Sequence, residues 1–307
     1  MENTTIPLQQ RVRTASRQAK PPWLKVRFPA GDRYQRIKSL LREQELHTVC
    51  EEARCPNIGE CFNSGTATFM ILGDVCTRAC GFCAVTSGRP ESGLDWLEPY
   101  RLAKAVRTLR LDYVVITSVN RDDQPDGGAG IFAACIRTIR RDNRDCRVEV
   151  LIPDFMGNWD ALETIVRARP FVLNHNVETA PRLYGRVRPK ARYERSLELL
   201  RCAKELDSSL LTKSGMMVGL GETEEEIFQV MADVRAAGTD LFTIGQYLRP
   251  SAKHLPVERY YPPEEFEPFV ERGRELGFQN VEAGPLVRSS YHAHKQAGVE
   301  TAVGGDF

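Results

Sequence analysis

The stretch that decides the fold reads Ala67-Thr-Phe-Met-Ile-Leu-Gly-Asp-Val-Cys-Thr-Arg-Ala-Cys-Gly-Phe-Cys83. It starts as a short apolar run, typical of a buried strand, and passes directly into a loop with three cysteines. Downstream, strand-like runs alternate with amphipathic helical segments about every thirty residues. This alternation indicates repeated βα units and predicts a parallel sheet.

Six such units are expected, so we predict an α/β fold built as a partial parallel (β/α)6 barrel of the TIM type. The predicted strands are 67–72, 113–119, 148–153, 171–177, 210–218 and 241–247. The predicted helices between them are 100–111, 131–141, 159–168, 196–206 and 224–237. An open doubly wound sheet is the alternative, but no Gly-x-Gly-x-x-Gly turn follows the first strand, which disfavours its dinucleotide-binding form.

The barrel is expected to cover residues 66–282. Residues 1–65 form an N-terminal extension with a cysteine-bearing loop and a short helix near 34–45, and residues 283–307 form a C-terminal segment. The basic stretch from Arg11 to Lys20 is interpreted as a solvated arm in preference to an organelle presequence.

Composition and charge limit the possible locations and partners of the chain. Of 307 residues, 42% are hydrophobic and 27% charged, as in a globular protein with a sizeable core. Lysine and arginine number 42 against 41 acidic residues, so the net charge of +1 offers no general attraction to nucleic acid or anionic lipid. With no secretory signal and no long apolar run, we expect a cytoplasmic protein that binds neither nucleic acid nor membrane.

Nine cysteines in a chain without an export signal point to metal binding in preference to disulfides. Cys76, Cys80 and Cys83 lie in the loop after the first predicted strand, where parallel α/β folds place their chemistry. Three thiolates at this spacing can hold three irons of a cubane cluster, which leaves the fourth iron open to a cofactor or substrate.

A second triplet, Cys50, Cys55 and Cys61, lies upstream of the barrel. Thiolate ligands suit an iron–sulfur cluster, zinc or copper(I), so composition alone does not choose the metal. The spacing disfavours zinc, because structural zinc sites favour pairs of ligands and both sets here are triplets. A purely structural reading, in which these thiols only pack, leaves their clustering on turn-rich loops unexplained. We reserve that reading for the three isolated cysteines, Cys135, Cys146 and Cys202.

The run from Cys76 to Cys83 resembles the cluster loop of the radical S-adenosylmethionine (SAM) superfamily. Six further stretches narrow the resemblance to the lipoyl synthase family: residues 47–61, 65–74, 117–123, 174–179, 219–223 and 288–293. It extends from about Pro22 to Ala293. Phe62 and Gln124 depart from the usual family residues, but neither is a ligand position.

The resemblance implies two 4Fe–4S clusters and SAM as cofactors. Cys76, Cys80 and Cys83 would hold the cluster at which SAM is cleaved to a 5′-deoxyadenosyl radical, and Cys50, Cys55 and Cys61, with the hydroxyl of Ser290, would hold an auxiliary cluster. From the residues alone, Ser289 and Ser290 would instead be read as a turn or helix cap.

The implied reaction is the insertion of two sulfur atoms, at C6 and C8, into a protein-bound octanoyl-lysyl group. The radical would take the hydrogens and a sulfide of the auxiliary cluster would supply the sulfur, so no side chain is expected to act as catalytic acid or base. The implied partners are octanoylated lipoyl domains of 2-oxoacid dehydrogenase complexes, the glycine-cleavage H protein, and an electron donor such as ferredoxin or flavodoxin.

Six residues at strand ends are candidates for binding SAM. Ser118 and Asn120 share one face of a predicted strand, as do Asn176 and Glu178, and Gly219 and Gly221 allow close approach of a ligand.

Other roles remain open for the residues around these candidates. Glu178 has an alternative role as partner of an inward arginine. His175, on the opposite face, is interpreted as a packing histidine. The run from Arg121 to Asp123 is either functional or an ion-pair cluster.

Two rival functions remain at this point. One is another radical sulfur-inserting enzyme resembling biotin synthase, against which the second cysteine triplet and the Arg288-Ser-Ser-Tyr291 ending argue. The other is a non-enzymatic iron–sulfur or zinc scaffold, which would leave the glycine loop and the Asn176/Glu178 pair without a role.

Overall fold

The computed structural model describes residues 19–26, 31–53, 55–63 and 68–299. Most of the predicted basic arm, and residue 67 of the first predicted strand, lie outside them.

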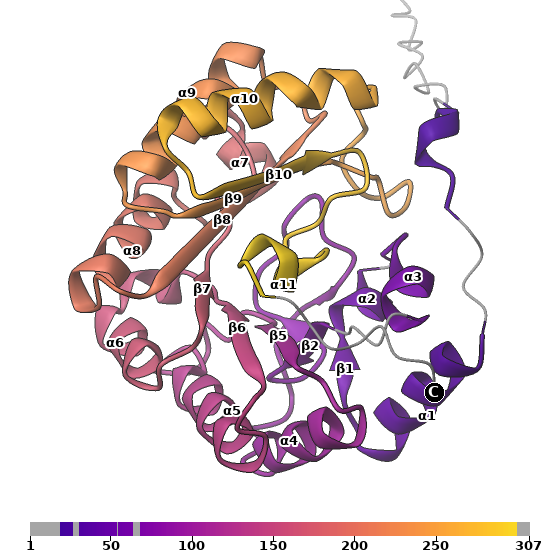
Figure 1. The fold of residues 1–307 in the computed structure, drawn as a ribbon, viewed down its shortest axis with the longest axis vertical. Helices are drawn as coiled ribbons and strands as arrows, with labels where there is room; N and C mark the ends of the chain where they lie inside the picture. Colours follow the sequence, from indigo (N-terminus) through magenta and orange to yellow (C-terminus); the bar gives the residue numbers. More distant parts are fainter. Residues whose placement is uncertain (1–18, 27–30, 54, 64–67, 300–307) are drawn as a thin grey trace, which may run out of the picture.

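The predicted α/β architecture is confirmed. One eight-stranded sheet has the order β1-β2-β5-β6-β7-β8-β9-β10 and curves into an open barrel (Figure 1). The six predicted strands are β2 (Thr68–Ile71), β5 (Tyr113–Ser118), β6 (Arg147–Leu151), β7 (Val172–Asn174), β8 (Leu211–Val218) and β9 (Leu241–Gln246). Neighbours among these six pair in parallel. The short β1 (His47–Thr48) pairs antiparallel with β2 at one edge.

Helices cover the outside of the sheet (Figure 1). The main ones are α4 (Glu98–Thr108), α5 (Ala129–Asp142), α6 (Trp159–Arg167), α8 (Tyr193–Leu206), α9 (Glu224–Ala236) and α10 (Glu267–Leu276). The N-terminal part contributes α1 (Asp32–Glu43), α2 (Val49–Glu52) and α3 (Ile58–Asn63), and later short helices are α7 (Tyr184–Val187) and α11 (Ala293–Gln296). Single 3-10 turns cover Pro22–Leu24, Phe155–Gly157, Pro181–Leu183 and Pro263–Phe266, and a separate ribbon pairs β3 (Val75–Cys76) with β4 (Thr86–Ser87).

The prediction of six parallel strands was too low by one. β10 (Asn280–Gly284) pairs in parallel with β9 and forms the second edge of the barrel. Its sequence is short and partly polar, and only Val281 is buried, so it lacks the apolar run that marks the other strands. The boundary predicted between residues 282 and 283 therefore falls inside a strand, and the three-part division of the chain remains a prediction.

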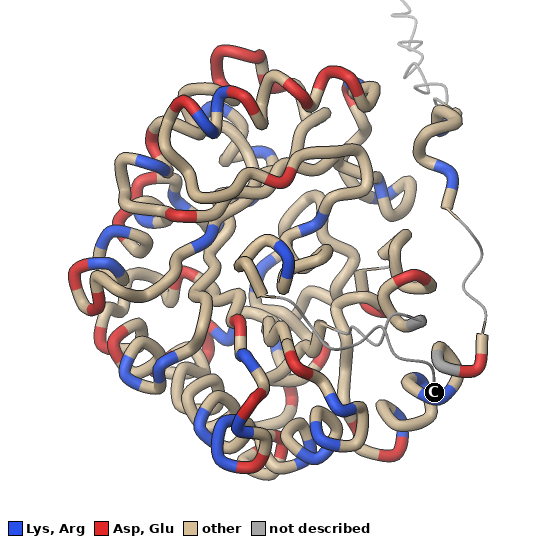
Figure 2. The backbone as a smooth tube through the Cα atoms, viewed as in Figure 1, with Lys and Arg blue, Asp and Glu red and all other residues tan. Residues whose placement is uncertain are grey.

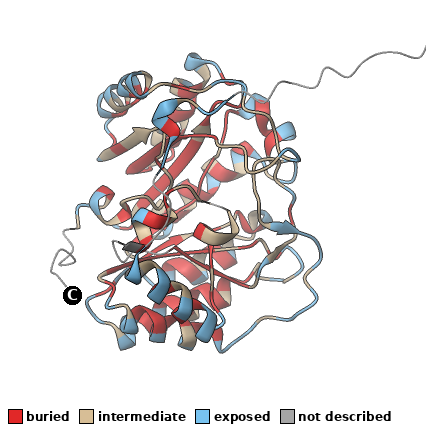
Figure 3. Ribbon diagram, turned by 90° about the vertical axis from the view of Figure 1, so that its right-hand side faces the viewer, coloured by how far each residue is buried: buried red, intermediate tan, exposed pale blue. Residues whose placement is uncertain are grey.

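The hydrophobic core lies between the sheet and the outer helices, and Figure 3 colours the buried residues of both red. Alternate strand residues such as Val114 and Phe242 face the helices and are almost fully buried. As predicted, the isolated cysteines pack in this layer: Cys135 and Cys146 are buried, and the half-buried Cys202 lies against the same cluster.

The inside of the barrel is polar, and the C-terminal segment enters it. Three side chains from different strands meet there at one carboxylate: Glu149 accepts hydrogen bonds from the Tyr113 hydroxyl and from Lys213 Nζ. After β10 the chain turns inward, and α11 lies within the ring of strands (Figure 1). There Ala293 packs against Tyr113 at the beginning of β5.

Basic and acidic residues are interspersed along the outer helices (Figure 2), in keeping with the near-zero net charge. Among the described residues, no helix is both long and apolar enough to cross a membrane.

Candidate functional site

The first cysteine triplet lies on the loop that leaves β2, as predicted, at the carboxyl ends of the strands. The loop is fixed by backbone hydrogen bonds from Thr77 to the Asn120 carbonyl (3.0 Å) and from Gly81 to the Val187 carbonyl (2.9 Å). A Cβ atom on Gly81 would lie only 2.9 Å from the Leu255 side chain, so glycine is required by close packing.

Arg78, between Cys76 and Cys80, fastens this loop to two neighbouring strand ends. Its buried guanidinium donates to both oxygens of Asp122 (2.8 Å each) and to Asp154 (2.5 Å), which also accepts from Arg195 (3.1 Å). Arg121 is buried as well and pairs with Asp123 at 2.9 Å. The run 121–123 thus forms ion pairs, one of the two interpretations of the sequence.

Two thiols of this loop, those of Cys80 and Cys83, are held in the protonated form when no metal is bound. Burial raises the pKa of Cys83 to about 12, and burial also raises the pKa of Cys80, although the charge of Arg188 opposes it. A thiolate in such a site needs a bound cation, and binding iron would release the proton. The chemistry of the loop therefore fits an iron–sulfur cluster.

Buried polar atoms without a hydrogen-bond partner gather beside this loop. They include Ser118 Oγ, Asn120 Oδ1 and Asn176 Oδ1, which belong to three of the predicted SAM-binding residues. Asn120 also donates from its backbone to Cys76 Sγ at 3.3 Å. Because buried polar groups are normally satisfied, these atoms indicate room for a polar ligand next to the cysteines.

Asn176 and Glu178 lie together, but not on a strand as predicted. β7 ends at Asn174, and Glu178 has a positive φ of 67°. Asn176 Nδ2 donates to Glu178 Oε1 (3.1 Å) and to Ser289 Oγ (2.6 Å). Burial raises the pKa of Glu178, while the charge of Arg188 opposes it. Arg188 Nη1 donates to the carbonyls of Asn176 and Val177 and not to the Glu178 carboxylate.

The glycine loop after β8 packs closely against other residues of the same chain. Gly219 and Gly221 have φ values of 100° and 108°, and a Cβ on Gly219 would clash with the side chain of Gln246 and the carbonyl of Arg259. The carboxylate of Glu222 accepts from the backbone nitrogens of Gly219 and Leu220. A role of this loop in cofactor binding remains a prediction.

His175 faces the helices, as predicted for a packing residue. Its Nδ1 contacts the Ile152 carbonyl at 2.8 Å and its Nε2 contacts Ser196 Oγ at 3.0 Å. Burial lowers its pKa to about 4.

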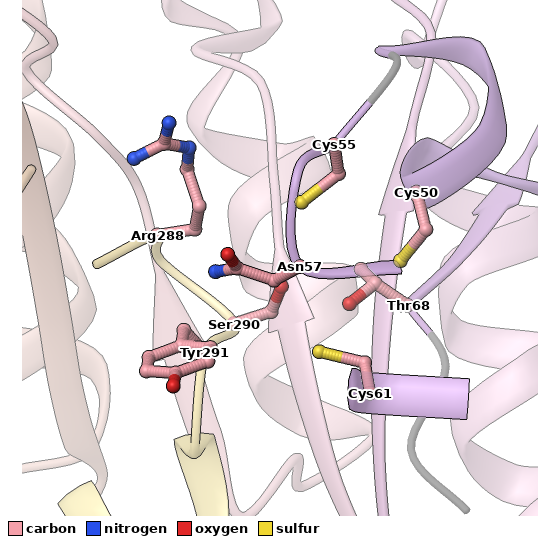
Figure 4. A pocket seen from close by; sticks show the side chains of 8 residues that line it. All are labelled: Cys50, Cys55, Asn57, Cys61, Thr68, Arg288, Ser290 and Tyr291. Atoms are coloured by element: carbon pink, nitrogen blue, oxygen red, sulfur yellow. The ribbon is translucent and has the colours of Figure 1, made fainter. Parts of the chain in front are cut away.

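The second cysteine triplet lines a pocket with residues from the far end of the chain (Figure 4). Cys50 lies on α2, Cys61 on α3, and Cys55 between them. The segment after β10 contributes Ser290, together with Arg288 and Tyr291, and Asn57 and Thr68 complete the lining. The structure thus places Ser290 beside three thiols that are more than 200 residues away in sequence.

Two side-chain hydrogen bonds join the cysteine loop to the C-terminal segment. Asn57 Nδ2 donates to the Leu286 carbonyl at 2.7 Å, and the Tyr291 hydroxyl donates to Glu60 Oε1 at 2.9 Å. The pocket therefore depends on contacts between both ends of the described chain.

These thiols, too, are protonated without a metal. Burial raises the pKa of Cys50 to about 12 and also raises the pKa values of Cys55 and Cys61. Over the described residues, no three Cys, His, Asp or Glu side chains converge closely enough to hold a single ion. The pocket offers three thiols and a hydroxyl around one shared space, a donor set that fits a thiolate-held cluster.

Comparison with protein families gives two matches. Residues 70–234 match the radical SAM superfamily, and residues 4–55 match the N-terminal domain of lipoyl synthase of the radical SAM family. The first match covers all three cysteines of the β2 loop, and the second covers Cys50 and Cys55.

The similar proteins include lipoyl synthases from several bacteria. That of Rubrobacter xylanophilus is 63% identical over 280 residues, which cover 91% of this chain and 87% of the relative. That of Roseiflexus sp. is 58% identical over 280 residues, 91% of this chain and 93% of the relative.

Solved structures share the fold at low sequence identity. The maturase HydG of the FeFe-hydrogenase from Carboxydothermus hydrogenoformans has a TM-score of 0.56 at 16% identity, over 80% of this chain and 64% of that one. Streptococcus suis SuiB, bound to its precursor peptide SuiA, has a TM-score of 0.56 at 11% identity, over 80% and 56%. The chain spans under two thirds of the length of both, and the likeness is one of fold.

Proposed function

This chain belongs to the lipoyl synthase family of the radical SAM superfamily, and from that premise we propose that each cysteine triplet holds its own 4Fe–4S cluster. The chain is a radical SAM enzyme that inserts sulfur into a protein-bound octanoyl group. Its family excludes both the biotin-synthase-like enzyme and the non-enzymatic scaffold.

We assign Cys76, Cys80 and Cys83 to the cluster that binds SAM. The polar groups of SAM would be met by the unpartnered buried atoms of Ser118, Asn120 and Asn176 and by the carboxylate of Glu178. Gly219 and Gly221 would border the adenosine part. Arg78 would hold the loop in register with the ends of β5 and β6 through Asp122 and Asp154.

We assign Cys50, Cys55, Cys61 and Ser290 to the auxiliary cluster. The observation that carries this assignment is the pocket in which the C-terminal segment brings Ser290 to three thiols of the N-terminal loops. An oxygen ligand binds soft iron less well than a thiolate, and a ligand that leaves readily suits a cluster that gives up sulfide.

The clusters and SAM, when bound, supply the radical that removes hydrogen from C6 and C8 and the sulfide that replaces it. Side-chain acids and bases cannot break an unactivated C–H bond, so the residues of this chain have other tasks. They would hold the two clusters, orient SAM by its polar groups, and exclude water.

The substrate is a protein-bound octanoyl group. We propose that its carriers are the lipoyl domains of 2-oxoacid dehydrogenase complexes and the glycine-cleavage H protein, and that a ferredoxin or flavodoxin reduces the clusters. We propose a cytoplasmic location because two sites built on thiolate ligands need a compartment in which thiols stay reduced.

An anaerobic assay of the reconstituted enzyme with SAM, a strong reductant and an octanoyl-lysyl peptide tests this proposal. We expect 5′-deoxyadenosine and sulfur-bearing peptide from the wild type, and only 5′-deoxyadenosine from Cys55→Ala. The isolated Cys202→Ala variant serves as a control and should retain both products. Sulfur insertion by Cys55→Ala at the wild-type level would refute the auxiliary site.

A further inference from the structure

A buried ion pair joins two strands of the barrel, β6 and β8. Lys213 Nζ on β8 lies 3.0 Å from Glu149 Oε1 on β6, and both side chains are fully buried. Glu149 also accepts from the Tyr113 hydroxyl (2.6 Å) and from Asn174 Nδ2 (3.3 Å). Burying two charges costs as much as their attraction returns, so stability alone does not explain this pair.

A second hydrogen bond of Lys213 indicates a role for this ion pair. Lys213 Nζ donates to the backbone carbonyl of Ser289 at 2.5 Å, while Asn176 Nδ2 donates to the hydroxyl of the same residue at 2.6 Å. Ser289 is therefore held from its main chain and its side chain by two different strand regions. The next residue is Ser290, which lines the three-cysteine pocket.

The segment that carries Ser290 has little regular structure of its own. It follows β10, which ends at Gly284, and precedes α11, which begins at Ala293. Before Ser289 its side-chain anchor is Asn57, which donates to the Leu286 carbonyl. After Ser290 it is anchored at Tyr291, whose hydroxyl donates to Glu60 and whose carbonyl accepts from Gln296 Nε2. Lys213 and Asn176 hold the part between these anchors.

We propose that Lys213, oriented by Glu149, is a positioning residue that fixes the Ser289 carbonyl and thereby presents the Ser290 hydroxyl to the auxiliary cluster. This inference rests on the ligand set proposed above. The hydrogen bonds of Lys213 go to Glu149 and Ser289, so its effect on the cluster passes through the position of Ser289. A weak oxygen ligand depends on such placement more than a strong thiolate ligand would.

The test uses a Cys76→Ala/Cys80→Ala/Cys83→Ala background, so that only the auxiliary cluster contributes iron. Lys213→Met leaves Glu149 buried without its partner, so the double variant Lys213→Met/Glu149→Gln is made beside it to remove both charges. Lys204→Met is the matched control, since Lys204 also pairs with a partly buried carboxylate, Asp240, at 2.7 Å. The readouts are the rate of iron release to a chelator and the electron paramagnetic resonance spectrum of the reduced cluster.

We expect the double variant to release iron about tenfold faster than the background, as Ser290→Ala does, because residues that orient a ligand typically affect metal affinity to this extent. Lys204→Met should match the background. Adding Ser290→Cys to the double variant should restore slow release, since a thiolate binds iron without precise placement.

Two results would overturn the inference in distinguishable ways. Slow release from the double variant, together with fast release from Ser290→Ala, would show that Lys213 does not position Ser290. Slow release and an unchanged spectrum in Ser290→Ala itself would instead remove Ser290 from the ligand set, and the inference with it.

Discussion

Replacing Arg78 should destabilise the chain even when it holds no cluster. Its guanidinium is almost completely buried and bridges Asp122 and Asp154 at the base of the first cysteine loop. Burial alone would raise the pKa of Asp154, but the hydrogen bond and charge of Arg78 lower it from 3.8 to about 2. Arg78→Met removes these interactions but keeps an unbranched, apolar side chain at this buried position.

The expected loss can be worked out from that pKa. A pKa lowered by nearly two units corresponds to about 2 kcal/mol of stability at neutral pH. The partly exposed pair with Asp122 adds up to about 1 kcal/mol, giving about 3 kcal/mol in total, near the lower limit for breaking a buried pair. Arg195 remains on Asp154, which keeps the loss from being larger.

Urea unfolding of the metal-free chain, followed by circular dichroism, measures this loss. The matched control is Arg167→Met, whose exposed pair with Glu163 should contribute about 0.5 kcal/mol or less. The contribution of Asp154 to stability is present above pH 3.8 and is lost as the pH falls toward 2. The difference in unfolding free energy between wild type and Arg78→Met should therefore become smaller between pH 3.8 and pH 2. A loss at pH 7 no larger than that of the control would refute the reasoning.

Three further predictions concern other positions. His175 is buried and has a pKa of about 4, against the usual 6.5, so lowering the pH from 7 to 5 protonates it only in the unfolded chain. This should lower the free energy of unfolding by about 2 kcal/mol. In urea titrations the His175→Gln variant should lack this pH-dependent loss. Gly219→Ala should destabilise the fold by more than about 2 kcal/mol in thermal unfolding, because the residue has a positive φ and its new Cβ would clash with the Arg259 carbonyl. The control Gly185→Ala has open space around its Cβ, and its stability should be unchanged or slightly higher. Glu178→Gln should weaken SAM binding about tenfold, as expected for the loss of one charged hydrogen bond, and should leave the iron content unchanged. Calorimetry measures the affinity, and an unchanged value would remove Glu178 from the SAM site.

Local patterns in the sequence were enough to predict the barrel and both cysteine loops. The six predicted strands, which are β2 and β5 to β9, are marked by apolar runs, and the two triplets are marked by their spacing within short loops. β10 was missed because its residues are mostly polar or small, and its place in the sheet is decided by pairing with β9. Asn176 and Glu178 were correctly placed together, but on a strand that ends two residues before the first of them.

The ion pairs that organise the site could not be predicted as pairs. Arg78 and Asp154 are 76 residues apart, and Glu149 and Lys213 are 64 apart, so no local pattern joins them. A partial signal existed, since Glu149 and Lys213 each stand within a predicted buried strand, where a charged side chain needs an interior partner. The placement of Ser290 came from family resemblance, because the contact that brings it to the cysteines spans most of the chain.

The measurement that most directly tests two separate cluster sites is the iron content of three reconstituted proteins: the wild type, the Cys76/Cys80/Cys83 triple alanine variant and the Cys50/Cys55/Cys61 triple alanine variant. Two independent four-iron clusters predict about eight irons per chain in the wild type and about four in each triple variant. Wild-type iron in the Cys50/Cys55/Cys61 variant, or loss of all iron from either variant while its fold is retained, would contradict two separate sites.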